Sequence, residues 1–147
     1  MDRRAVLQAG LSLCAGAATV RAGGALHAAE QTPAATQSKP LGAHPLGPAF
    51  EGFQGTMLEV TYPPGVTSAA HQHPGPTFGY VVSGKVKWAI NGEPAKVLEA
   101  GQSFFEPMGS VHSTSANASD TEPAKLSVVI LSKPGEPLSK PTAKTGR

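Results

Sequence analysis

The chain has 147 residues, a length typical of a single domain. Charged residues make up only 15% of it, Gly (17) and Pro (14) are abundant, and the formal net charge is +2. A chain with so little excess positive charge is a poor candidate for binding nucleic acid, because phosphate contacts require a basic surface. Many glycines and prolines in a short chain favour short strands over long helices.

The first 29 residues have the pattern of an export signal. Arg3 and Arg4 precede an apolar stretch that reaches Val20, and small residues follow it. The paired arginines favour the twin-arginine route, and the stretch is shorter than the ~20 residues that cross a bilayer. We expect an exported protein, periplasmic or extracellular, with no stable membrane insertion after signal removal; an uncleaved N-terminal anchor is the alternative. Signal removal takes away three of 12 basic and one of 10 acidic residues, which leaves nine of each.

Two further segments lack the alternation of apolar and polar residues that strands require. Residues 30–49 are rich in Pro, Ala and Thr, which predicts a linker or an N-terminal arm. Residues 133–147 are rich in Pro and Lys, which predicts a solvated tail. Residues 50–132 between them are expected to form one folded domain.

Short apolar runs bounded by turn residues predict an all-β domain. Residues 85–90, with the sequence KVKWAI, alternate clearly between polar and apolar side chains. Ser83-Gly84 predicts a tight hairpin between the runs on either side of it, and Asn91-Gly92 predicts another. The expected strands indicate a sandwich or barrel. They cover residues 56–62, 78–82, 85–90, 94–98, 102–106, 111–115 and 125–131.

Three histidines are spaced so that a fold made of strands can bring them together. His71 and His73 are two residues apart, so both imidazoles project from the same face of a strand. His112 follows after four predicted strands, and Gly109 and Pro107 shape the turn before it. Three imidazoles can hold a divalent transition metal such as Fe, Zn, Mn, Ni or Cu. The alternative is three histidines with a purely structural role.

The glycine spacing around the first two histidines resembles the first motif of the cupin superfamily. That motif is a glycine, five residues, His-x-His, three or four residues, Glu, six residues and a glycine. Gly65, His71, His73 and Gly84 match it, and Thr77 occupies the position of the glutamate. A neutral threonine hydroxyl is a poor ligand, so we expect a pocket-wall residue, with ligation as the alternative. The expected site is three histidines plus solvent, which leaves the metal its full charge and an open face.

The second cupin motif is a glycine, five residues, Pro-x-Gly, two residues, His, three residues and Asn. Its asparagine position holds Ala116, with Asn117 next to it. The matching residues are Gly101, Pro107, Gly109 and His112. The resemblance covers residues 50–131 and implies a single conserved β-barrel of jelly-roll type with the metal inside.

Other residues near the motifs are candidates for the site. Glu106 could replace the missing carboxylate, although a solvated glutamate at the end of a strand is the preferred interpretation. We expect the pocket wall to include Thr77, Phe78, Trp88 and Phe104.

The resemblance implies a metal-dependent dioxygenase or isomerase that acts on a small oxygenated molecule. The sequence assigns no catalytic residue and leaves open whether the protein is an enzyme at all. The main alternative is a non-catalytic module that binds a small molecule or a metal, and a third is a cupin fold retained without metal. Cupins are often dimers, so the resemblance also suggests a homodimer.

Overall fold

The computed structural model describes residues 34–142, and the expectations for an export signal and for the start of the linker lie outside the described residues. No helix in the described range is long and apolar enough to cross a membrane. A single 3-10 turn, η1 (Pro48–Phe50), accompanies eleven strands in this range. The strands are β1 (Gln37–Pro45), β2 (Gln54–Tyr62), β3 (Thr67–Ser68), β4 (His71–Gln72), β5 (Thr77–Ser83), β6 (Lys85–Ile90), β7 (Lys96–Glu99), β8 (Ser103–Glu106), β9 (Val111–Asn117), β10 (Ala124–Ser132) and β11 (Lys140–Pro141).

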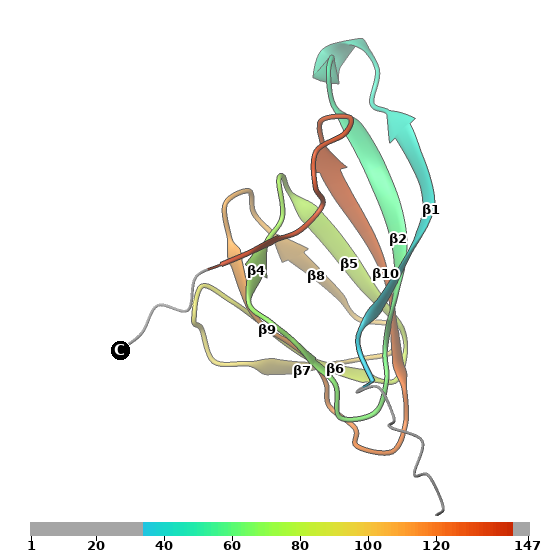
Figure 1. The fold of residues 1–147 in the computed structure, drawn as a ribbon, viewed down its shortest axis with the longest axis vertical. Helices are drawn as coiled ribbons and strands as arrows, with labels where there is room; N and C mark the ends of the chain where they lie inside the picture. The colour runs from blue at the N-terminus through green and yellow to red at the C-terminus, as the bar shows by residue number, and fades with distance from the viewer. Residues whose placement is uncertain (1–33, 143–147) are drawn as a thin grey trace, which may run out of the picture. The chain divides into compact units, whose positions relative to one another are not determined.

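These strands form two antiparallel sheets (Figure 1). One sheet has the order β1-β2-β10-β5-β8, and the other has the order β11-β4-β9-β6-β7, with β3 added beside β9. Apart from β1-β2 and β6-β7, neighbours in each sheet are not consecutive in sequence, as in a jelly roll. The expected all-β jelly-roll fold is therefore confirmed.

Alternation along the strands builds a core on the inner face of each sheet. On β10 every second residue is buried, including Leu126, Val128 and Ile130. Val86 and Trp88 on β6 supply the facing side of the same apolar cluster. Burying a side chain of this size contributes about 1.5–3 kcal/mol, so the alternation fixes which face of each strand points inward.

The segments predicted as a linker and a tail differ from expectation, because both contribute strands. β1, within residues 30–49, pairs with β2 from Gln37↔Thr61 to Pro45↔Gln54. β11, within residues 133–147, pairs with β4. Both are edge strands with mostly exposed side chains. Backbone hydrogen bonds hold them, so their sequences need little apolar alternation.

The hairpin expected at Ser83-Gly84 is wrong, because β5 and β6 belong to different sheets. The chain crosses between the sheets at Gly84, where φ is +74° and a Cβ atom would lie 2.6 Å from the carbonyl oxygen of Pro123. A turn dipeptide indicates a reversal of direction and not the pairing of its flanks. The expected turn at Asn91-Gly92 does join a paired β6 and β7, and both residues have positive φ.

A bulge in β9 explains why the asparagine is one position late in the second motif. Ala89 of β6 pairs with Thr114, but the next residue, Ile90, pairs with His112, so Ser113 is an extra residue. The bulge places His112 and Asn117 on the same inner face. The side-chain amide of Asn117 there donates to the carbonyls of Tyr62, Pro63 and Glu122.

Close packing at Gly79 gives a test of this fold. A Cβ atom at Gly79 would lie 2.0 Å from Cζ of Phe104, its cross-strand partner on β8. We expect Gly79→Ala to lower the free energy of unfolding by about 1–3 kcal/mol, because the ring must move within a packed core. Urea denaturation measures this. In the control Gly55→Ala, where the nearest atom lies 3.4 Å away, the change should stay below about 0.5 kcal/mol. Equal stabilities for the two variants would contradict the packing described.

Candidate metal centre

The structure brings the three predicted histidines together. His71 on β4 pairs across the sheet with His112 on β9, and His73 follows directly after β4. The ring centroid of His71 lies 4.9 Å from that of His73 and 5.0 Å from that of His112. Nitrogen atoms, one from each ring, lie within 4.8 Å of one another. The His-x-His spacing and the bulged strand therefore aim three imidazoles at one point.

Backbone carbonyls fix the orientation of two of these rings. Nδ1 of His71 lies 2.8 Å from the carbonyl oxygen of Ala69, and Nδ1 of His73 lies 2.7 Å from that of Leu138. A carbonyl only accepts hydrogen bonds, so each Nδ1 carries the proton and each neutral ring keeps its lone pair on Nε2. Histidines that bind metals typically donate their other ring nitrogen in this way.

Burial keeps the histidines in the neutral form that binds metals. Burial, together with the neighbouring rings of His71 and His73, lowers the pKa of His112 to about 3. Burial also lowers the pKa of His71 and that of His73. The Nε2 atom of His112 is buried and has no hydrogen-bond partner among the described residues. An unpartnered polar atom at this depth is costly unless a ligand satisfies it.

The donor set fits a divalent transition metal. Two nitrogen ligands with bonds of about 2.1 Å lie at most about 4.2 Å apart, so the observed spread of up to 4.8 Å closes with small side-chain movements. Neutral imidazoles suit Fe, Zn, Ni and Cu alike. Such a metal, when bound, would be held by His71, His73 and His112.

The expectation of a solvated Glu106 is wrong. Glu106 is only 2% exposed, and its Oε1 accepts a hydrogen bond of 3.1 Å from Nε1 of Trp88. The same oxygen lies 3.1 Å from Nδ1 of His112, and Oε2 lies 3.6 Å from Nε2 of His73. Burial raises the pKa of this carboxyl, and the hydrogen bond from Trp88 opposes that effect. The two-residue period of a strand predicts the burial of Glu106, because Phe104, two residues earlier, is expected to face the pocket.

Three of the four predicted pocket residues face the interior of the barrel, and the fourth faces outward. Thr77 is fully buried and lines the pocket, as does Phe104. Trp88 is 9% exposed and lies in the core behind His112, where it holds Glu106. The prediction that Phe78 lines the pocket is wrong, since its side chain is 52% exposed and packs against Phe105 on the outer face of the sheet. It follows the inward-facing Thr77 by one residue, so it must point outward.

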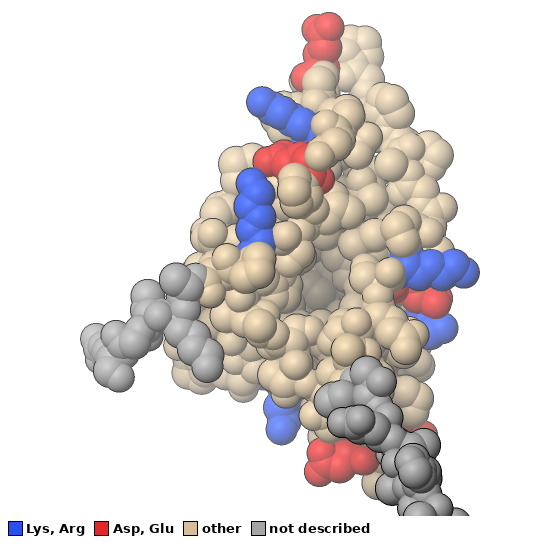
Figure 2. All heavy atoms as spheres, viewed as in Figure 1, with Lys and Arg blue, Asp and Glu red and all other residues tan. Residues whose placement is uncertain are grey.

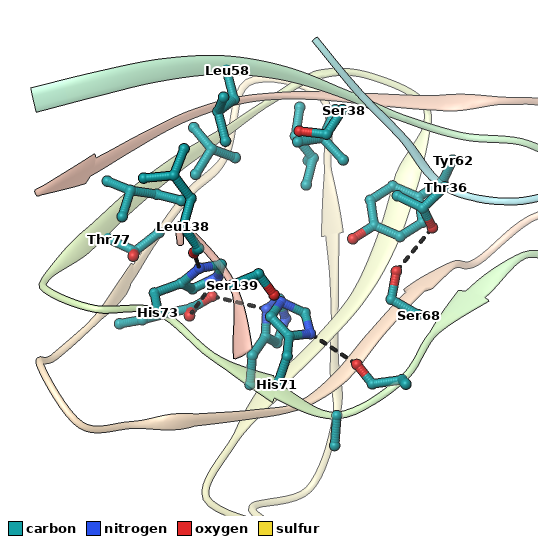
Figure 3. Close-up of a pocket in the computed structure, with 18 of the residues that line it drawn as sticks. Thr36, Ser38, Leu58, Tyr62, Ser68, His71, His73, Thr77, Leu138 and Ser139 are labelled. Atoms are coloured by element: carbon teal, nitrogen blue, oxygen red, sulfur yellow. Dashed lines mark hydrogen bonds and ion pairs between the residues drawn. The ribbon is translucent and has the colours of Figure 1, made fainter. Parts of the chain in front are cut away.

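A pocket of about 430 Å³ opens above the histidines. Figure 3 shows His71 and His73 on one side of it, with Thr36, Ser68 and Tyr62 farther away. A hollow is visible in Figure 2, surrounded by uncharged residues, with the Lys, Arg, Asp and Glu side chains lying farther out. Apolar side chains form most of the wall, namely those of Leu58, Val60, Phe104, Leu126, Val128, Ile130 and Leu138.

The segment after β10 completes this pocket, which the sequence did not predict. Leu138 packs against the core, and its carbonyl accepts the proton of His73. Leu138, Ser139 and Pro141 line the pocket, and Figure 3 shows Leu138 and Ser139 beside the histidines. The expected solvated tail is therefore, up to Thr142, part of the site.

Comparisons with known proteins agree with this fold. Residues 58–130 match the family described as the cupin domain. This match spans 73 of the 147 residues and agrees with the cupin-type jelly roll that the two sheets form. No curated protein matches the chain.

Several solved structures have a similar fold. DMSP lyase DddQ from Ruegeria pomeroyi has a TM-score of 0.52 at 24% identity, over 63% of this chain and 45% of that one. An uncharacterized conserved protein with a double-stranded beta-helix domain from Klebsiella pneumoniae has a TM-score of 0.53 at 19% identity. The alignment covers 71% of this chain and 89% of that one. Oxalate oxidase in complex with the substrate analogue glycolate has a TM-score of 0.53 at 25% identity. The alignment covers 70% of this chain and 53% of that one. The aligned part is thus about half the length of the lyase and of the oxidase.

Shortening the tail tests its contribution to the site. Deleting residues 133–147 removes the carbonyl that orients His73, so we expect metal affinity to fall by about 10–100-fold, the usual effect of losing an orienting partner. Deleting only residues 143–147 is the matched control and should leave the affinity unchanged, because Leu138 and β11 stay in place. Competition with a chromophoric chelator measures both. Equal affinities in the two shortened proteins would show that the tail does not support the site.

Proposed function

We propose that this protein binds a divalent transition metal through His71, His73 and His112 and uses it to act on a small oxygenated molecule. The observation that carries the proposal is the convergence of three neutral imidazoles on the floor of an apolar pocket. The tautomers of His71 and His73 are set by backbone carbonyls, as ligand histidines require. The expected chemistry is that of a dioxygenase or an isomerase.

The pocket wall indicates what kind of molecule fits. Its volume of about 430 Å³ lies within the range of about 300–1,000 Å³ that is usual for small-molecule sites. No Lys or Arg is among the described residues that line it, so a metal would be the main positive charge available to a ligand. We therefore expect a largely apolar molecule whose oxygen atoms face the histidines.

Hydroxyl groups provide a second point of recognition, away from the histidines. Thr36 and Ser68 share a hydrogen bond of 2.8 Å, and Ser38 and the ring of Tyr62 lie at the same side of the pocket (Figure 3). These groups can donate to and accept from a polar substituent at the far end of the ligand. The apolar wall between the two ends excludes water from the ligand body.

Within this site the protein's own residues bind and orient the ligand. A bound divalent metal would act as a Lewis acid or, if redox-active, would activate dioxygen. Within residues 34–142, Glu106 is the one buried carboxyl group beside the histidines. Oxalate oxidase, a similar structure at 25% identity, is described in complex with its substrate analogue glycolate, which is a small oxygenated molecule but lacks the apolar body expected here.

A second candidate function is a binding module without turnover. The observation that favours it is the scarcity of acid and base groups, since Tyr62 and Glu106 are the only ionisable side chains besides the histidines among the described residues that line the pocket. Such a module would sequester or sense its ligand.

Metal analysis of His112→Ala tests the proposed function. Wild-type protein should contain about one equivalent of metal, and the variant should lose at least about 100-fold in affinity, because a ligand matters more than its orienting partners. His44→Ala is the matched control, since His44 is exposed on β1 and outside the pocket. Wild-type protein that takes up no metal after reconstitution would contradict the proposal.

Turnover separates the enzyme from the binding module. Metal-loaded protein should consume oxygen or convert substrate with one member of a panel of catechols, diketones, thiols and flavonoids, and the rate should vanish in His112→Ala. Ligands that raise the melting temperature of the loaded protein without any turnover would support the binding module instead.

The proposal includes export, because Arg3 and Arg4 precede an apolar stretch of suitable length. Replacing both with lysine should abolish the mature form in the periplasm of a bacterial host with the twin-arginine route, as measured by cell fractionation. Arg21→Lys, in the same leader but beyond the pair, is the control. An unchanged periplasmic amount in the double variant would exclude this route.

A further inference from the structure

The position that lacks the cupin glutamate has a carboxylate directly across the sheet. Thr77 on β5 and Glu106 on β8 are opposite partners in an antiparallel pair. Side chains that face each other in this way project from the same side of the sheet, with Cβ atoms about 4.5–5.5 Å apart. Both are buried, at 0% and 2% exposure. We propose that Glu106 is the fourth protein ligand of the metal, a carboxylate displaced by one strand. This inference rests on the proposed metal binding.

The contact between Glu106 and His73 indicates a cation between them. Nδ1 of His73 donates to the carbonyl of Leu138, so the lone pair of the neutral ring is on Nε2. That lone pair faces Oε2 of Glu106 at 3.6 Å, which is too long for a hydrogen bond. Two ligands of a tetrahedral metal with bonds of about 2.1 Å are about 3.4 Å apart. The separation thus matches that of two atoms that share one ion.

The two carboxylate oxygens have different surroundings. Oε1 accepts the hydrogen bond from Trp88 and lies beside Nδ1 of His112. Oε2 is buried and has no hydrogen-bond partner among the described residues. One oxygen is therefore held in place while the other is free to bind, an arrangement typical of a ligating carboxylate. Trp88 acts here as a positioning residue.

A carboxylate ligand changes the electrostatics expected from the sequence. Three neutral imidazoles leave a divalent ion with its full charge, and Glu106 reduces the net charge of the centre by one. The centre then attracts anionic molecules less strongly, which agrees with an apolar pocket that lacks Lys and Arg.

A different role for the same residue is to orient His112 through Nδ1 without touching the metal. Both roles predict that removing the carboxylate weakens binding, so a single substitution does not separate them. Thr77→Glu, measured alone and together with Glu106→Gln, separates them: if Glu106 ligates, the new carboxylate restores affinity only where Glu106 is missing, and if Glu106 orients His112, the new carboxylate changes affinity equally in both backgrounds.

The experiment compares Glu106→Gln, Thr77→Glu, Thr77→Glu/Glu106→Gln and wild type for binding of Zn²⁺ and Co²⁺, by chelator competition and elemental analysis. Glutamine keeps an oxygen for Trp88 but removes the charge. We expect Glu106→Gln to lose at least about 100-fold in affinity, and the double variant to recover at least about tenfold of that loss. Glu93→Gln, which removes an exposed charge on the turn after β6, should stay within about twofold of wild type.

Thermal unfolding gives a second readout that is independent of activity. Metal-free Glu106→Gln should be at least as stable as metal-free wild type, because it lacks a buried carboxylate without a cation. Its metal-induced rise in melting temperature should be smaller than that of wild type. A variant with these two properties is folded and binds the metal more weakly.

The outcomes separate this inference from the function on which it rests. Wild type that binds no metal would overturn both. Wild type that binds metal, with equal affinity in Glu106→Gln, would overturn the role of Glu106 alone. Loss of affinity in Glu106→Gln, with an equal change in affinity from Thr77→Glu in the presence and absence of Glu106, would assign Glu106 to orienting His112 and would likewise overturn ligation.

Discussion

The two-residue period of the strands determines which strand side chains face the candidate site. On β8, Phe104 and Glu106 point inward, and on β5 Thr77 does the same. Apolar and polar side chains of the site therefore project from the same inner faces of the strands. A one-residue shift in strand register would expose all of these side chains. Phe78 and Phe105 show the other half of the pattern, because they stack outside the barrel with ring centroids 4.8 Å apart.

Burial then sets the chemistry of the polar cluster. A low-dielectric pocket disfavours protonated histidines, so His71, His73 and His112 stay neutral, and two of them are oriented by backbone carbonyls. A buried carboxylate beside neutral rings adds negative charge without a compensating Lys or Arg among the lining residues. A cation bound there would offset this charge, which is consistent with the proposed metal binding.

The fold and the three histidines could be predicted because their determinants are local in sequence. The glycine and proline spacing defines turns, and His-x-His defines a shared face. β1 and β11 could not be predicted, since edge strands are held by backbone hydrogen bonds that leave little trace in side-chain pattern. The role of Leu138 was hidden for the same reason, because its carbonyl is what His73 contacts. The burial of Glu106 could have been predicted from strand alternation, but two adjacent phenylalanines leave the buried face of β8 ambiguous in the sequence.

Both departures from the cupin motifs are displacements in sequence that the fold compensates in space. Asn117 arrives one residue late, and the bulge at Ser113 returns it to the inner face that bears His112. On the proposed assignment, the carboxylate moves from position 77 to Glu106, one strand away at the paired position. A sequence motif specifies the spacing of residues along the chain, whereas metal binding depends on the positions of the donor atoms in space. A missing motif residue in a β-barrel is therefore best sought first at its cross-strand partners, and only then taken as a lost function.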